Sequence, residues 1–177
     1  KGLKKIKNKY VLLMIDDLLL NKKISNNYFK EVLQWINNKE PNYARLSISN
    51  KPKKYDNLFG IINSKDPYKI STMPSIWKKT TLEQLLKKGE SAWDFEIIGS
   101  KRAKKINNFF SVYNNLISYE NAIIKGKWQK SIIYKFNIFH TERPIMSSLE
   151  QAIYNMKVLR SKFFNSLPIQ IRILIKN

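Results

Sequence analysis

The sequence predicts an α/β fold, a sheet flanked by helices, and three local patterns support this prediction. A continuous apolar run at residues 10–15 is typical of a strand that is covered on both faces. Residues 26–38 carry apolar side chains at helical spacing, and Ser25 before them is a good N-terminal cap. Residues 43–48 read as a second strand, so residues 10–48 are expected to form a βαβ-like unit.

The middle of the chain is predicted to continue with short strands and helices. Residues 49–66 are polar and rich in Asn, Lys and Pro, which indicates mostly loop. A short strand is expected at 68–72, and Thr80 with Glu83 predicts a capping box for a short helix. The next elements are expected to be a helix from about 91 to 106, then strands at 109–113 and 116–124 joined by a turn at Asn114-Asn115.

Residues 147–177 are predicted to form a C-terminal helix and a basic tail. Ser147 and Ser148 offer a cap, and Glu150 gives the first turn an acidic residue. One face of this helix is marked by five apolar residues, Leu149, Ile153, Met156, Leu159 and Phe163. No internal repeat or domain boundary is evident, so residues 1–177 are expected to form a single domain.

The charge is strongly basic, with 33 Lys and Arg against 13 Asp and Glu and a formal net charge of +20. Such a charge points to nucleic acid or an anionic membrane. However, Lys supplies 28 of the cations and Arg only 5, whereas proteins that recognise the phosphates and bases of nucleic acids favour Arg. The 24 Ile and 19 Asn residues, like Lys, are encoded by A/T-rich codons, so we attribute much of the charge to composition.

Composition also excludes several classes of site. The absence of Cys excludes disulfides and Cys-based metal or redox sites, and a single His does not favour a zinc site. No apolar run reaches the roughly 20 residues of a membrane span, and no signal-peptide pattern is visible.

Asp16 and Asp17 lie side by side at the end of the most apolar predicted strand. Ligands of open α/β sheets bind beyond the carboxyl ends of strands, and paired carboxylates there can hold Mg²⁺ or Mn²⁺ with a phosphate-bearing ligand. The alternatives are a solvated strand end or a pair of charges at a helix N-terminus.

A second acidic cluster comprises Glu90, Asp94 and Glu96, with Trp93 among them. Asp94 in the first turn of a helix would be ionised and could accept a proton from a sugar hydroxyl beside the aromatic ring. The alternative is that these acids only stabilise the helix.

These two segments resemble a known family. The run YVLLMIDDLLL at 10–20 resembles the metal-binding strand of GT-A glycosyltransferases, which ends in a DxD-type motif. The segment MPSIWKKTTLEQLLKKGESAWDFEIIGSKRA at 73–103 is similar to the acceptor side of family-2-like bacterial enzymes. The resemblance covers roughly residues 10–130 and implies a partial Rossmann sheet of GT-A type. It also implies that the N-terminal nucleotide-binding strands are missing and that the chain is the C-terminal part of such a domain.

The resemblance assigns roles to individual residues. Asp17 and Asp16, with His140 as a further ligand, would hold Mn²⁺ or Mg²⁺, and Asp94 would be the catalytic base, with Glu90 and Glu96 as alternatives. Trp77 and Trp93 would form walls of the acceptor pocket, with core packing as the alternative, and Arg102, a further expected ligand contact, matches an Arg-containing segment of the family. Apart from the resemblance, Lys127 and Trp128 are candidate donor or acceptor contacts in a loop after a strand, where a lysine could meet the donor phosphates or simply be solvated.

The function implied is an inverting, metal-dependent transfer of a sugar from a nucleotide-sugar donor to a glycan or lipid-linked acceptor. The expected setting is bacterial surface-polysaccharide synthesis, such as capsule or lipopolysaccharide, in the cytoplasm with peripheral contact at the inner face of an anionic membrane. Two alternatives remain open: a basic module that binds single-stranded nucleic acid, and a non-catalytic domain that retains the glycosyltransferase scaffold.

Overall fold

A computed structural model describes residues 2–48, 52–66, 68–138 and 141–166. The chain divides into two compact units, residues 1–120 and 121–177. Each unit is described by itself below.

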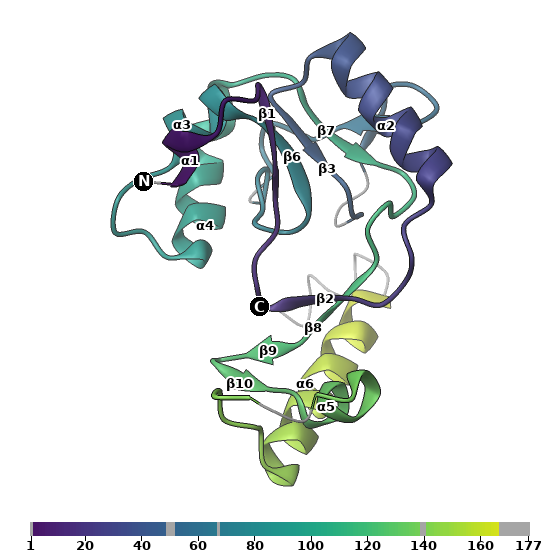
Figure 1. The fold of residues 1–177 in the computed structure, drawn as a ribbon, viewed down its shortest axis with the longest axis vertical. Helices are drawn as coiled ribbons and strands as arrows, with labels where there is room; N and C mark the ends of the chain where they lie inside the picture. Colours follow the sequence, from purple (N-terminus) through teal and green to yellow (C-terminus); the bar gives the residue numbers. More distant parts are fainter. Residues whose placement is uncertain (1, 49–51, 67, 139–140, 167–177) are drawn as a thin grey trace. The chain divides into compact units, whose positions relative to one another are not determined.

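The first unit is built on a mixed six-stranded sheet with the order β1-β6-β3-β7-β5-β4 (Figure 1). The strands are β1 (Tyr10–Leu13), β3 (Tyr43–Arg45), β4 (Lys53–Lys54), β5 (Phe59–Ile61), β6 (Ser75–Lys78) and β7 (Phe109–Val112). β6 is antiparallel to both β1 and β3, and β3 is parallel to β7. Therefore β1, β3 and β7 all run in the same direction and end at the same edge of the sheet.

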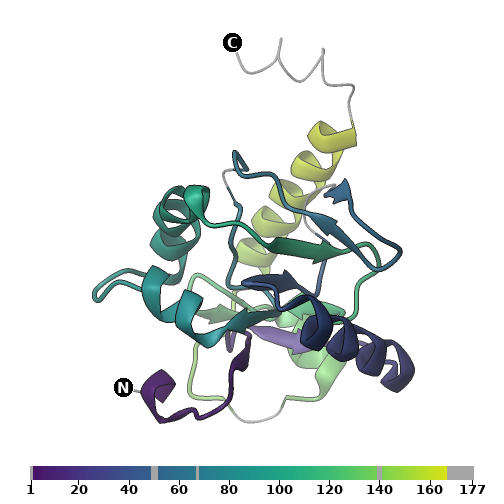
Figure 2. The same ribbon diagram turned by 90° about the horizontal axis from the view of Figure 1, so that it is seen from above.

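Helices cover both faces of this sheet (Figures 1 and 2). α2 (Asn26–Lys39) packs against one face, where Val32, Trp35 and Ile36 join a core with Ala44 and Phe110. α3 (Lys79–Leu85) and α4 (Ala92–Arg102), which continues as a 3₁₀ turn at Ala103–Lys105, cover the other face. Their core residues are Leu82, Leu85, Phe95 and Ala103, which pack with Tyr43, Trp77 and Phe109 of the strands.

Three smaller elements complete the first unit. α1 (Gly2–Lys5) precedes β1, and β2 (Leu18–Leu20) pairs with β8 (Tyr119–Asn121), the strand in which this unit ends.

A buried lysine holds the 3₁₀ turn that follows α4. Lys69 is only 2% exposed, and its Nζ donates to the carbonyl oxygens of Ala103 at 2.9 Å and Ile106 at 2.6 Å.

The structure confirms the predicted α/β class and several elements. β1 and β3 are parallel and connected through α2, with β6 inserted between them, so residues 10–48 form the expected βαβ-like unit. Ser25 caps α2 by accepting a hydrogen bond from the Tyr28 backbone N–H at 3.4 Å. β7 and the start of α4 also fall where they were expected.

Other predictions were wrong. The strand expected at 68–72 is instead β6 at 75–78, and residues 49–66 contain β4 and β5 rather than loop alone. The capping box of Thr80 and Glu83 does not form, because α3 already begins at Lys79. β7 pairs with β3 and β5, so residues 109–113 and 116–124 do not form a hairpin.

The second unit contains the hairpin β9 (Ile123–Ile124) and β10 (Lys127–Trp128), followed by α5 (Lys130–Phe136) and α6 (Ser148–Ser166). The hairpin turns at Lys125 and Gly126, both with positive φ, as a two-residue turn of this hand requires. Two buried amides, Gln129 and Gln151, hydrogen-bond to each other at 3.1 Å and join the start of α5 to α6.

α6 begins as predicted. Ser147 Oγ accepts from the Glu150 backbone N–H at 3.2 Å, and the Glu150 carboxylate accepts from the Ser147 N–H at 2.8 Å. Within the described residues, no helix is both long and apolar enough to cross a membrane. The tail expected at the end of 147–177 falls largely on residues 167–177, which lie outside the described residues.

Candidate active site

The carboxyl edge of the first unit's sheet carries a row of polar residues on the face that α4 covers. Arg45 of β3 lies opposite Ser75 of β6 on one side and Ser111 of β7 on the other. All three are at most 2% exposed. The next row into the sheet is aromatic, since Tyr43 lies opposite both Trp77 and Phe109. An aromatic core therefore ends in a polar border at the edge where α/β sheets bind ligands.

Arg45 is a buried cation in the centre of this border. It is 1% exposed, and its Nε donates to the Tyr43 hydroxyl at 3.1 Å and its Nη2 to the Tyr68 carbonyl oxygen at 2.6 Å. No carboxylate in the described part of the chain forms an ion pair with it. At 1% exposure the guanidinium presents no surface to a ligand, so its charge acts at this edge of the sheet through its positive potential.

Sequence reasoning missed Arg45. The available signals were its position in a predicted strand and the fact that it is one of only five arginines among 28 lysines. Its isolation from acidic residues is visible only in the folded chain.

Asp16 and Asp17 lie in the turn between β1 and β2. β1 ends at Leu13, which lies opposite Ser75 in the same row as Arg45. The acidic pair therefore follows a strand, as predicted, with Asp16 exposed and Asp17 half-buried. The expectation of a strand at 10–15 covered on both faces was wrong, because β1 ends at Leu13, lies at the edge of the sheet and leaves Leu12 56% exposed. Among the described residues, no three His, Cys, Asp or Glu side chains are grouped as metal ligands. A cation held by Asp16 and Asp17 would have to take its remaining oxygens from a diphosphate and water.

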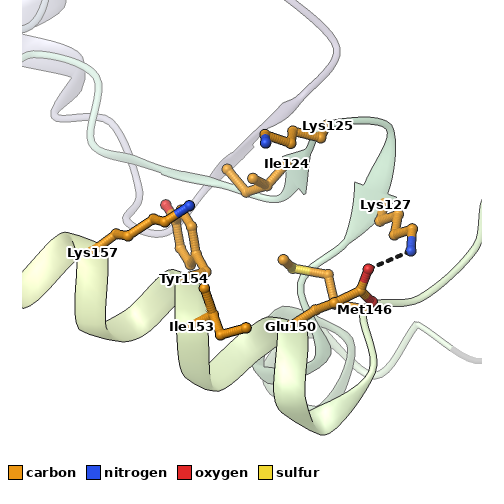
Figure 3. Close-up of a pocket in the computed structure, with 8 residues that line it drawn as sticks. All are labelled: Ile124, Lys125, Lys127, Met146, Glu150, Ile153, Tyr154 and Lys157. Atoms are coloured by element: carbon orange, nitrogen blue, oxygen red, sulfur yellow. Dashed lines mark hydrogen bonds and ion pairs between the residues drawn. The ribbon is translucent and has the colours of Figure 1, made fainter.

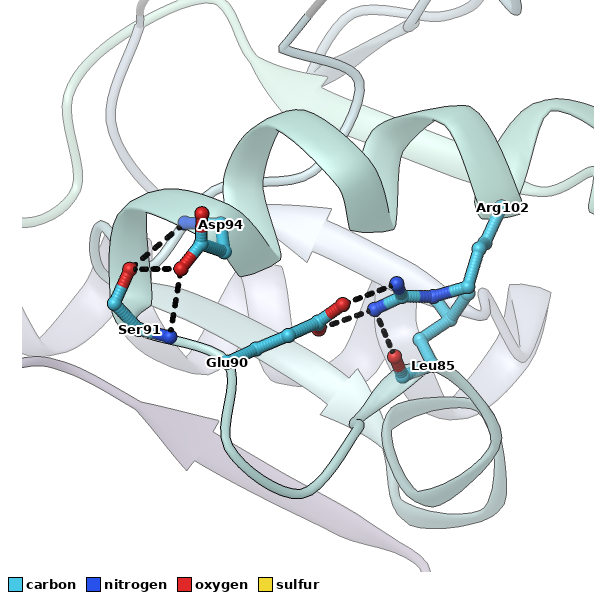
Figure 4. A network of polar contacts seen from close by, with 5 residues as sticks. All are labelled: Leu85, Glu90, Ser91, Asp94 and Arg102. Atoms are coloured by element: carbon cyan, nitrogen blue, oxygen red, sulfur yellow. Dashed lines mark hydrogen bonds and ion pairs between the residues drawn. The ribbon is translucent and has the colours of Figure 1, made fainter.

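Asp94 forms a capping box with Ser91 at the start of α4 (Figure 4). Its Oδ2 accepts from the Ser91 N–H at 3.1 Å and from Ser91 Oγ at 2.6 Å, while its own N–H donates to Ser91 Oγ at 3.1 Å. The hydrogen bonds from the Ser91 side chain and backbone lower the pKa of Asp94 below its ordinary value. The carboxylate is thus ionised and oriented, and Oδ1 accepts no hydrogen bond from the described residues.

Glu90 and Arg102 form a two-pronged ion pair (Figure 4). Arg102 Nη1 and Nη2 donate to the two carboxylate oxygens of Glu90 at 2.6 Å each, and Nη2 also donates to the Leu85 carbonyl oxygen. The hydrogen bond from Arg102 lowers the pKa of Glu90. The pair joins the end of α3 to both ends of α4, so both residues contribute to the fold, and their roles as alternative base and ligand contact stay predictions.

Glu96 holds the segment before β6 against α4. Its Oε1 accepts three hydrogen bonds, from Ser71 Oγ at 2.7 Å, from the Thr72 N–H at 2.7 Å and from Thr72 Oγ1 at 2.8 Å. Ser71 and Thr72 lie just before Ser75 of the polar row, so this contact fixes the second turn of α4 at the same edge of the sheet. These hydrogen bonds indicate that Glu96 stabilises the fold by holding α4 to the segment before β6.

The two tryptophans proposed for the first unit differ sharply in exposure. Trp77 is fully buried, packs against Tyr43 and Phe95, and donates from Nε1 to Ser75 Oγ at 3.0 Å. Its ring fills the core and presents no face to a sugar. Trp93 is 62% exposed and meets the half-exposed Tyr68 edge-on, with the ring centroids 6.2 Å apart. Trp93 and Tyr68 thus offer an aromatic surface beside Asp94.

The remaining candidates lie elsewhere. Lys127 and Trp128 belong to the second unit, in β10, where Lys127 pairs with Glu150 at 2.5 Å. Trp128 is half-buried, and its Nε1 has no hydrogen-bond partner among the described residues. His140 lies outside the described residues, so its predicted role as a metal ligand stays a prediction.

The structure thus places Arg45 and the Asp16-Asp17 pair at the carboxyl ends of parallel strands. Asp94 and Trp93 belong to the first turn of α4, and Tyr68, whose ring Trp93 meets, accepts a hydrogen bond from Arg45 through its carbonyl oxygen. Comparison of the chain with protein-family models, curated proteins and solved structures found no match.

Proposed function

We propose that the first unit is a GT-A-like sugar-transferring domain that receives a nucleotide-sugar at the carboxyl edge of its sheet. The observation that carries this proposal is the pairing, at one edge, of an unpaired buried cation with an acidic pair after a parallel strand. A nucleoside diphosphate can share a divalent cation with Asp16 and Asp17, and the positive potential of the buried Arg45 favours an anion at this edge.

In this proposal each group has one task. The two aspartates would hold Mn²⁺ or Mg²⁺, which would neutralise charge on the leaving diphosphate, and the buried Arg45 would add positive potential at this edge. Trp93 and Tyr68 give the acceptor an apolar surface. Asp94, oriented by Ser91, would accept the proton of the attacking hydroxyl through Oδ1. The hydrogen bonds that lower its pKa also make it a weaker base, so orientation rather than basicity supports this role. The acceptor oxygen then bonds to the anomeric carbon as the diphosphate leaves, and the configuration inverts.

A second candidate is a non-catalytic domain with the same scaffold. Its support is that Glu90, Asp94 and Glu96 all make contacts that stabilise α4. Such a domain would bind the nucleotide without transferring the sugar.

Calorimetry of the full chain with a panel of uridine and guanosine diphosphate sugars, with and without Mn²⁺, tests the first proposal. Binding should require the metal and be lost in Asp17→Asn but not in the matched control Glu31→Gln, which changes an exposed acid of α2. Absence of metal-dependent binding would end the proposal.

Where binding is found, Asp94→Asn separates the two candidates. It should retain nucleotide binding and abolish release of the diphosphate if Asp94 is the base. A single-stranded oligonucleotide titrated in parallel tests the nucleic-acid alternative, whose affinity must fall steeply with salt.

A further inference from the structure

α6 exposes the apolar face that the sequence pattern marked. Leu149, Met156, Leu159 and Phe163 are between 61% and 70% exposed, and Ile153 is 39% exposed. Buried or half-buried residues lie on the opposite side of the helix, among them Gln151, Tyr154 and Val158. Helices of globular proteins normally turn such a stripe toward the core. A contiguous apolar surface of this kind indicates an interaction site.

A pocket of about 260 Å³ lies beside the stripe and within the second unit (Figure 3). Ile124, Met146 and Ile153 form its apolar part, and Ile153 also belongs to the stripe. Three lysines, Lys125, Lys127 and Lys157, surround it. Lys127 is paired with Glu150, whereas Lys125 and Lys157 form no ion pair with the described carboxylates. The pocket therefore combines an apolar floor with cationic groups that are available to an anion.

The excess of positive charge in the second unit favours an anionic lipid surface over a second copy of the chain as the partner of this face. The described part of the second unit contains eight Lys or Arg and only two Glu, and Arg160 lies within the apolar stripe of α6. A second copy of the chain would bring these cations together, with Glu150 already paired to Lys127. An anionic lipid surface suits both features, because apolar side chains enter the acyl boundary while Lys and Arg reach the phosphates.

We propose that α6 and the lysine-rimmed pocket dock on the surface of a bilayer that contains anionic phospholipid. The stripe residues lie in the boundary between headgroups and acyl chains, and the pocket receives the phosphate and the adjoining apolar part of one lipid. Lys125, Lys157 and Arg160 contact lipid phosphates. This inference is independent of the proposed function, since it uses only residues of the second unit.

The lack of Cys in the chain allows a direct test with single labelled cysteines. Phe163→Cys places an environment-sensitive fluorophore on the stripe, and Ser161→Cys places it on the opposite flank of the same helix turn as a matched control. With vesicles of phosphatidylcholine and phosphatidylglycerol, the label at residue 163 should shift to shorter wavelength and the label at 161 should not. Phosphatidylcholine alone should give a much weaker response.

Vesicle sedimentation of unlabelled protein completes the test. The double variant Met156→Ser, Leu159→Ser should lower affinity for the anionic vesicles at least about tenfold, because each side chain loses apolar burial. Leu86→Ser, which changes an exposed leucine of the first unit, should have no effect. No sedimentation at low salt, or equal losses in both variants, would overturn the proposal. So would a label at 163 that is already shielded without vesicles, since protein would then cover the stripe.

Discussion

Replacement of Glu96 tests whether this member of the acidic cluster stabilises the fold or acts as a catalytic base. The structure gives Glu96 three donors, all directed at Oε1. Glu96→Ala removes the acceptor of the Ser71 and Thr72 hydroxyls and of the Thr72 N–H, in residues that are only 7% and 8% exposed. Glu96→Gln keeps an amide oxygen at the same position and loses only the charge.

The expected magnitudes follow from the hydrogen bonds. A hydrogen bond to a charged group contributes about 1.5–3 kcal/mol, and contributions of neighbours are not additive. Glu96→Ala should therefore lower the free energy of unfolding of the first unit by about 2–4 kcal/mol. Glu96→Gln should lower it by about 1 kcal/mol, because neutral hydrogen bonds remain. Glu83→Ala, at an exposed acid of α3 whose contact with Lys79 is 4.0 Å long, should change it by less than about 0.5 kcal/mol.

Urea unfolding followed by the fluorescence of the buried Trp35 and Trp77 measures these differences. Equal stability of Glu96→Ala and Glu83→Ala would refute the structural assignment of Glu96. Glu96→Gln as unstable as Glu96→Ala would refute the argument that an uncharged acceptor suffices.

Four further predictions follow from the same contacts. Trp77→Ala should cost about 3–5 kcal/mol because a fully buried ring is removed, whereas Trp93→Ala should leave urea stability nearly unchanged and weaken only acceptor binding. Lys69→Met leaves two carbonyl oxygens at the end of α4 without their donor and should destabilise the first unit by about 2 kcal/mol in the same assay. Ser91→Ala should cost about 1 kcal/mol through loss of the cap, and helix content by circular dichroism should fall if α4 frays. The pKa of Glu90 is lowered by Arg102, so its contribution is complete above the unfolded pKa of about 4.3 and is lost as pH falls through the lower folded pKa. Stability measured from pH 6 to 3 should therefore fall less steeply in Glu90→Gln, and an unchanged slope would contradict the ion pair.

The parts of the fold that follow from local chemistry could be predicted. Caps at Ser25, Ser91 and Ser147 lie next to the helices that they begin, and the apolar run at 10–15 predicts the strand at 10–13. Its exposure could not be predicted, because the position of β1 at the edge of the sheet depends on pairing with the distant β6. β6 could not be predicted in this way. It is four residues long and follows Pro74, and its strand conformation depends on pairing with β1 and β3, which lie far away in the sequence.

In the candidate site, too, some features follow from local sequence and others depend on residues that are distant in the sequence. The position of Asp16-Asp17 after β1 follows from the sequence, because strand and turn are neighbours. The burial of Trp77 depends on Tyr43 and Phe95, and the role of Glu96 depends on Ser71 and Thr72, so neither could be predicted from local sequence. The exposed stripe of α6 shows that amphipathic spacing predicts a helix but does not say whether its apolar face is covered.

Paramagnetic broadening by Mn²⁺ in the presence of a uridine or guanosine diphosphate tests the central claim most directly. If the carboxyl edge of the sheet binds the diphosphate, the amide signals of Asp16, Asp17, Arg45 and the start of α4 should broaden, and those of α2 should remain sharp. Asp17→Asn should abolish the effect. Broadening that is uniform over the chain, or that is confined to other acidic residues, would contradict a nucleotide-sugar site at this edge.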